Sequence, residues 1–147
     1  MINRFREKYF FLSNFFPTEV TIDGITYLNA EAAFQSFKAS SIKDKQDLSK
    51  MKDPVMAKRQ GRKFKIDIEE WNKISEQAMY QVVKAKFSQN TRLRKLLLDT
   101  GFEYIEEGNM HHDNFWGVCR CNGSKCLDTV AHNKLGKILM KVRDELK

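Results

Sequence analysis

The chain has 147 residues, of which 41% are hydrophobic and 31% charged, a balance typical of a folded globular protein rather than a disordered or fibrous one. This length predicts a single domain over residues 1–147 with one core. No run of about 18 apolar residues occurs, so we expect no membrane-spanning helix. The formal net charge of +7 favours anionic ligands such as phosphates or nucleic acid.

The start of the chain has a short aromatic stretch and no small-residue cleavage site, so we expect no signal peptide. Residues 20–22 and 25–27 flank Asp23-Gly24, the signature of a type I′ hairpin. Asn29 can cap a helix to about residue 40, and Asp53-Pro54 can begin a helix that stops near Gly61. The predicted class is therefore α+β, a helix-rich domain with a small antiparallel sheet.

Helical spacing of apolar residues predicts two further core helices. One covers 70–87, with Trp71, Ile74, Ala78, Val82 and Ala85 on its buried face. The other is C-terminal, with a stripe formed by Leu135, Ile138, Leu139, Val142 and Leu146. A shorter helix is expected at 91–99, ended by Gly101. A short strand around Tyr104 and Ile105 is followed by a polar loop, and ordered loops of this length usually carry function.

Glu31 falls in the first turn of the helix capped by Asn29, where free backbone amides and the helix dipole favour a carboxylate that is ionised at neutral pH. An ionised carboxylate can stabilise an oxocarbenium-like cation or take a proton from water. Gln35 lies one turn further on the same face. The alternative is that Glu31 only complements the helix dipole.

Asp113 and Trp116 stand three residues apart in the sequence DNFWG, and Gly117 allows a close backbone approach. A tryptophan beside an acid suits a flat base stacked on the ring. The alternative is that Trp116 belongs to the core and Asp113 caps a turn.

A basic run could bind a phosphate, although most such runs are solvated faces. It consists of Lys58, Arg59, Arg62, Lys63 and Lys65. No nucleotide-binding glycine motif is present, so chemistry on nucleoside triphosphates is not expected.

Three cysteines, Cys119, Cys121 and Cys126, lie within eight positions. Their odd number argues against a disulfide framework and favours a reducing cytoplasm. With a nearby histidine (His111, His112 or His132) they could form a tetrahedral zinc site. Their spacing is not that of the common zinc knuckles, so we interpret them as ordinary thiols and predict neither a metal nor a cofactor.

Nine short blocks occur in a fixed order along nearly the whole chain. They are FLSNF, DG-x-TY, Glu31, F-Q-x-x-KA, AK-x-x-GR, KF-x-QN, L-x-x-TG, D-x-x-WG and N-x-LG-x-x-LM-x-VR. In this order they resemble the NADAR superfamily, also called YbiA-like.

The resemblance implies a cofactor-free N-glycosidase that hydrolyses the bond between a nitrogenous base and a ribose phosphate or ADP-ribose. Its substrate would be a phosphoribosylamino-pyrimidine of riboflavin synthesis, or ADP-ribosylated guanine in nucleic acid. By position, Glu31 and Asp113 match the family's acids and Trp116 its aromatic residue. The resemblance also makes four residues of the matching blocks candidate ligand contacts: Ser13, Asn14, Lys58 and Arg62.

Two departures from the family pattern matter. Ala32 and Ala33 follow Glu31 where a histidine or tyrosines are expected, and the loop after Gly117 is longer and carries the cysteines. Two other classes of protein stay open: a non-catalytic module that binds ADP-ribose or nucleic acid, and a zinc-stabilised nucleic-acid adaptor.

Overall fold

The computed structural model describes residues 1–147, which form two compact units. One unit is Asn14–Leu93, and the other combines Met1–Ser13 with Arg94–Lys147. Each unit is described by itself. The sequence-based prediction of a single domain over 1–147 stays a prediction.

The unit Asn14–Leu93 begins with an antiparallel hairpin of β1 (Pro17–Ile22) and β2 (Ile25–Asn29). Asp23 and Gly24 have φ values of 50° and 81°, the two positive angles that a type I′ turn requires. This confirms the predicted hairpin.

Helix α1 (Ala30–Gln35) follows β2 directly and continues into the 3₁₀ turn η2 (Ser36–Lys38). Asn29 caps it as predicted, since its Oδ1 accepts a hydrogen bond from the Ala32 amide at 2.8 Å. All six residues of α1 are buried, because both strands, α3 and α4 pack around it.

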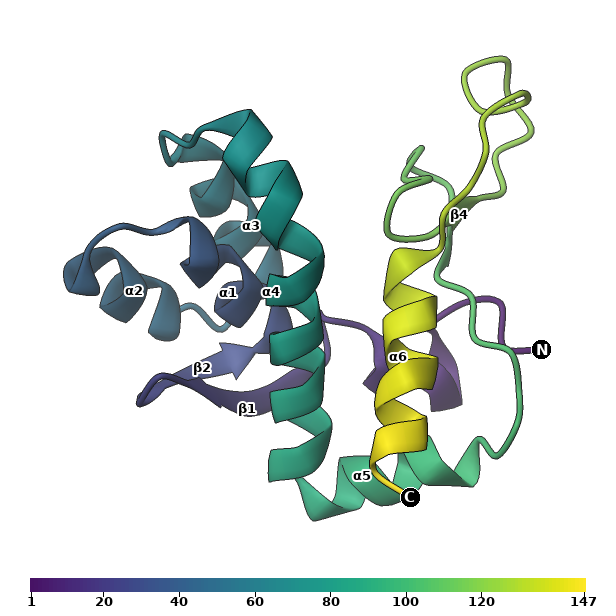
Figure 1. Ribbon diagram of the computed structural model, residues 1–147, viewed down its shortest axis with the longest axis horizontal. Helices are drawn as coiled ribbons and strands as arrows, with labels where there is room; N and C mark the ends of the chain where they lie inside the picture. The colour runs from purple at the N-terminus through teal and green to yellow at the C-terminus, as the bar shows by residue number, and fades with distance from the viewer. The chain divides into compact units, whose positions relative to one another are not determined.

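The remaining helices of this unit are α2 (Ile42–Ser49), α3 (Pro54–Lys63) and α4 (Ile68–Gln89). Figure 1 shows α1, α2, α3 and the hairpin on the same side of the long α4. The predicted helix from Asp53 continues two residues past Gly61, and α2 was not predicted.

The buried face of α4 differs from the predicted stripe. Ile74 is 40% exposed, Trp71 and Ala85 are partly buried, and only Ala78 and Val82 are buried as expected. The full buried set is Ser75, Ala78, Met79, Val82, Val83, Lys86 and Phe87. Five of these residues, including a lysine, fall outside the stripe that hydrophobicity and spacing predicted.

The other unit contains the 3₁₀ helix η1 (Glu7–Leu12), the parallel two-residue strands β3 (Gly108–Asn109) and β4 (Val118–Cys119), and α6 (Lys134–Glu145). The border between the units falls inside α5 (Thr91–Asp99). The stripe predicted for the C-terminal helix is confirmed, since all five residues are buried. Ile105 forms only an isolated bridge with Ile2, so the strand predicted around it is wrong.

These elements confirm the α+β class with many helices and a small antiparallel hairpin. Among the helices, none combines the length and the apolar character needed to cross a bilayer.

Candidate active site

Glu31 is the buried acid of the unit Asn14–Leu93, with 7% of its surface exposed. Its backbone amide donates to the carbonyl oxygen of Asn14 at 3.0 Å, which ties the start of α1 to the segment before β1. Its Oε1 accepts a hydrogen bond from Gln35 Nε2 at 2.9 Å. The position of the carboxyl is therefore fixed at both the main chain and the side chain.

Burial raises the pKa of Glu31 above its ordinary value, because the ionised form loses its hydration. The hydrogen bond from Gln35 and the charges of Lys58, Lys38 and Arg62 lower this pKa, but they do not cancel the effect of burial. The sequence predicted a carboxyl kept ionised by a helix terminus. In the structure burial acts in the opposite direction, and ionisation of Glu31 at neutral pH stays a prediction.

Lys58 and Arg62 lie one turn apart on α3, which packs against α1, so both charges act on the Glu31 carboxyl. Lys38 on η2 is the third cation of this group; it belongs to the F-Q-x-x-KA block but was not among the predicted site residues. Burial lowers the pKa of Lys38, and the charge of Glu31 raises it. We call Glu31, Gln35, Lys38, Lys58 and Arg62 the carboxyl cluster.

Trp71 brings an aromatic ring to this cluster, since Lys38 Nζ lies 5.2 Å from its ring centroid. The ring of Phe34 lies 5.4 Å away on the buried side. Sequence spacing predicted Trp71 on the buried face of α4, whereas in the structure Trp71 is only partly buried.

Gly61 explains how α3 comes so close to α1. A Cβ atom at this position would overlap the end of the Gln35 side chain, so any larger residue would displace that side chain. Gln35 Oε1 is buried and has no hydrogen-bond partner in the protein. An acceptor of this kind is available to a donor on a bound molecule or to a water molecule.

Asn14 and Ser13 were selected from the FLSNF block. The side chain of Asn14 is buried and donates to Met79 Sδ at 3.2 Å, while its carbonyl holds the Glu31 amide. Asn14 therefore positions Glu31. Ser13 is half-buried at the end of η1 and belongs to the other unit.

Asp113 caps a tight turn in the other unit. Its Oδ1 accepts hydrogen bonds from the amides of Phe115 at 3.0 Å and Trp116 at 2.9 Å. Asn109 closes the turn from outside, because its Nδ2 donates to the Asp113 carbonyl at 2.8 Å. At least one carboxylate oxygen thus has the turn-capping role that the sequence left open as an alternative.

Trp116 is half-buried at the end of this turn, edge-to-face with the Phe115 ring at 4.8 Å. Its carbonyl accepts from the Leu135 amide at 2.9 Å, which fixes it to the start of α6. Gly117 is needed beside it, since a Cβ there would overlap Glu107.

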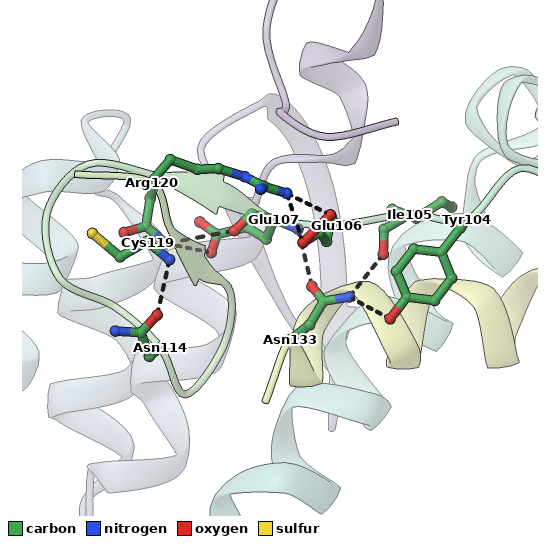
Figure 2. A network of polar contacts seen from close by, with 9 residues as sticks. Tyr104, Ile105, Glu106, Glu107, Asn114, Cys119, Arg120 and Asn133 are labelled. Atoms are coloured by element: carbon green, nitrogen blue, oxygen red, sulfur yellow. Dashed lines mark hydrogen bonds and ion pairs between the residues drawn. The ribbon is translucent and has the colours of Figure 1, made fainter. Parts of the chain in front are cut away.

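Asn133 is a further organising residue that sequence reasoning missed. It adopts a left-handed conformation with φ of 48°, and its side chain joins Glu107 N at 3.0 Å to the Ile105 carbonyl at 2.9 Å (Figure 2). The only sequence feature that pointed to Asn133 was its position as the first residue of the block N-x-LG-x-x-LM-x-VR. It connects the segment before β3 to α6.

The predicted site residues thus fall into two groups. Glu31, Gln35, Lys58 and Arg62 come together in one unit, beside Asn14. Asp113 and Trp116 come together in the other unit, which also contains the three cysteines and Ser13. The cysteines gather around His112, while His111 and His132 lie outside that group.

The chain is similar to known proteins over its whole length. The model of the NADAR domain matches residues 2–147. The N-glycosidase YbiA of Escherichia coli is 32% identical over 91% of this chain and 79% of its own length. The NMR structure of E. coli YbiA superimposes with a TM-score of 0.80 at 31% identity, covering 99% of this chain and 84% of that one.

A riboflavin biosynthesis protein of Vibrio vulnificus is 33% identical over 95% of this chain. The chain spans only 36% of the length of that protein.

Proposed function

We propose that this chain, which belongs to the NADAR family, is an N-glycosidase that hydrolyses the bond between a nitrogenous base and a ribose phosphate or ADP-ribose. The observation that carries the proposal is the carboxyl cluster: a buried acid with a raised pKa, one hydrogen-bonded amide and three cations. The names of the relatives, N-glycosidase and riboflavin biosynthesis protein, support the same reaction class.

Glu31 is the proposed catalytic carboxylate. Departure of the base from C1′ leaves positive charge on the sugar, and a carboxylate in a poorly solvated site stabilises that charge more strongly than one in water. A raised pKa also makes Glu31 a stronger base toward the attacking water. Water then adds its oxygen to C1′, and the base leaves with the balancing proton.

Lys58, Arg62 and Lys38 are the proposed phosphate ligands. Three cations surround one carboxylate, so the cluster keeps an excess of positive charge that a phosphate would neutralise. Arginine presents a planar fork of donors suited to phosphate oxygens, and lysine acts as a point charge. The same cations lower the pKa of Glu31 and so favour its ionised form before substrate binds.

Gln35 is proposed to hold a donor of the substrate or the attacking water. Its Nε2 is used by Glu31, and its buried Oε1 has no partner in the protein. One water hydrogen bonded to Gln35 Oε1 and Glu31 would have its lone pairs directed away from both acceptors.

Asp113 and Trp116 are proposed base-binding residues. Trp116 offers a partly exposed aromatic ring for stacking, and Asp113 holds the turn that carries it. Asp113 Oδ1 therefore positions Trp116. We propose that the other carboxylate oxygen of Asp113 contacts the leaving base.

The experiment is to incubate the purified protein with three candidates: a phosphoribosylamino-pyrimidine, ADP-ribosylated guanine in DNA, and NAD. Mass spectrometry then detects released base. Release from one candidate without any added cofactor, lost in Glu31→Gln, supports a hydrolase that acts through Glu31. Tight binding of ADP-ribose or nucleic acid without any released base supports the non-catalytic module instead.

A further inference from the structure

We propose that the loop after β3 binds one structural zinc ion through His112 Nδ1 and the Sγ atoms of Cys119, Cys121 and Cys126. The four ligand atoms all lie within 4.8 Å of one another. The sequence favoured ordinary thiols, because it could not show that His112 folds back onto all three cysteines. This inference is independent of the proposed reaction.

The distances fit a tetrahedral zinc site. His112 Nδ1 lies 3.3 Å from Cys126 Sγ, 3.5 Å from Cys121 Sγ and 3.9 Å from Cys119 Sγ. Zinc–sulfur bonds of about 2.3 Å and zinc–nitrogen bonds of about 2.0 Å at tetrahedral angles separate sulfur from nitrogen by about 3.5 Å. The four side chains therefore need little movement to enclose the ion.

The ligand set selects the metal and its role. Three thiolates and one imidazole suit zinc, whereas magnesium and calcium require oxygen ligands. Four protein ligands fill the tetrahedron and leave no position for a substrate or water, so the ion is structural. Binding converts the three thiols to thiolates and releases their protons.

The backbone around the cysteines supports ligation. The amide of Gly123 donates to Cys121 Sγ at 3.4 Å, a hydrogen bond that favours the thiolate and orients it. His112 and Asn122 both adopt left-handed conformations, with φ of 69° and 56°. Such conformations are uncommon for residues other than glycine, and one falls at a ligand and the other directly after one.

Cys119 comes from an anchored strand. It lies on β4, which pairs with β3, and its amide donates to Asn114 Oδ1 at 2.9 Å (Figure 2). The next residue, Arg120, donates from Nη2 to both carboxylate oxygens of Glu106, at 2.8 Å to Oε1 and 2.7 Å to Oε2. One zinc ligand is therefore held in place before the metal binds.

The rest of the loop lacks a core of its own. From Met110 to His132, Gly117 is the one buried residue. Burial of apolar surface cannot order such a segment, and small cores of this kind need a metal or a disulfide. His112 and Cys119 bracket the turn of Asp113 and Trp116, so the ion would clamp the two ends of that turn together.

The test is the zinc content of the full chain purified with a thiol reductant and no affinity-tag histidines. Elemental analysis and native mass spectrometry should give one zinc per chain. Cobalt substitution should produce thiolate charge-transfer bands and the intense visible bands of a tetrahedral site.

Cys121→Ser and His112→Ala should lose the zinc, whereas the matched controls His111→Ala and His132→Ala should keep it. Circular dichroism of each variant checks that the helices remain. On the wild-type protein, a zinc chelator should speed tryptic cleavage after Lys125, the exposed residue before Cys126, by roughly tenfold or more. Zinc added back should restore the slow cleavage.

Three results would overturn the proposal: wild-type protein without stoichiometric zinc after zinc loading, equal zinc loss in the His111→Ala control, or a disulfide between two of the cysteines in the reduced preparation. Cleavage after Lys125 that does not respond to the chelator would do the same.

Discussion

Replacing Glu31 with glutamine removes one negative charge and keeps the shape of the side chain and an acceptor for Gln35 Nε2. We expect this variant to be more stable than the wild type and to lose activity. Both effects have the same cause, because the carboxylate that serves the reaction is buried at a cost to folding.

The direction of the stability change follows from the linkage between protonation of Glu31 and folding. The folded-state pKa of Glu31 lies above the ordinary value of 4.5, so the native state binds more protons than the unfolded state between these two values. Stability contributed by this group therefore falls as pH rises through that window, and the full cost is present above the folded-state pKa. Glutamine has no such cost at any pH.

The stability gain at neutral pH grows with the rise in the pKa of Glu31, by about 1.4 kcal/mol for each pKa unit. For 147 residues, each kcal/mol gained raises the melting temperature by about 3 °C. The rate of base release should fall by roughly 100-fold or more, the usual effect of losing a catalytic acid or base.

Thermal unfolding and base release are measured from pH 4 to 8 on the wild type, Glu31→Gln and the control Glu19→Gln, whose side chain is exposed on β1. The stability gain should shrink toward low pH, where the wild-type carboxyl is protonated. Unchanged turnover would refute the catalytic role of Glu31. A lower melting temperature at neutral pH would refute the claim that its ionised form is costly.

Three further predictions concern the same unit. Gly61→Ala should displace the Gln35 side chain and lower turnover. The loss of turnover should be smaller in a Gln35→Ala background, and equal losses in both backgrounds would contradict a direct contact between residues 61 and 35. Lys58→Met should raise both the KM of a phosphate-bearing substrate and the lower pKa of the pH–rate profile. The control Arg59→Met, at the exposed neighbouring position, should change neither. Equal effects of the two variants would indicate that only the overall positive charge of the surface matters. Burial lowers the pKa of Lys86 from 10.5 to about 7, so the unfolded state binds more protons over this range and stability rises with pH. Between pH 7 and 9, urea unfolding should show the wild type gaining roughly 2 kcal/mol relative to Lys86→Met, and parallel pH profiles would argue against this shift.

Local signals predicted much of the fold. Asp23-Gly24 fixes the hairpin because both residues tolerate positive φ, and Asn29 caps α1 because its side chain replaces a missing backbone acceptor. The stripe of α6 is also correct. These features depend on residues close in sequence, so the sequence alone contains the information.

Features that depend on distant residues were missed. Ile74 fits the helical period of α4 but is exposed, while Lys86 is buried, because the packing of the hairpin and α1 selects which face is covered. The position of His112 among the cysteines likewise depends on two positive-φ residues that no pattern reveals.

The pKa of Glu31 shows how burial can oppose the electrostatic effect that a correct local assignment predicts. Its position in the first turn of a capped helix was correct, and that position alone favours an ionised carboxylate. However, α1 is only six residues long and is enclosed by four elements, so its dipole is small and the loss of hydration is large. Burial therefore sets the direction of the shift, and the cations of α3 and η2 provide the compensation that the short helix cannot. It follows that mutations on α3 will change the chemistry of Glu31 more than mutations of its own cap, Asn29.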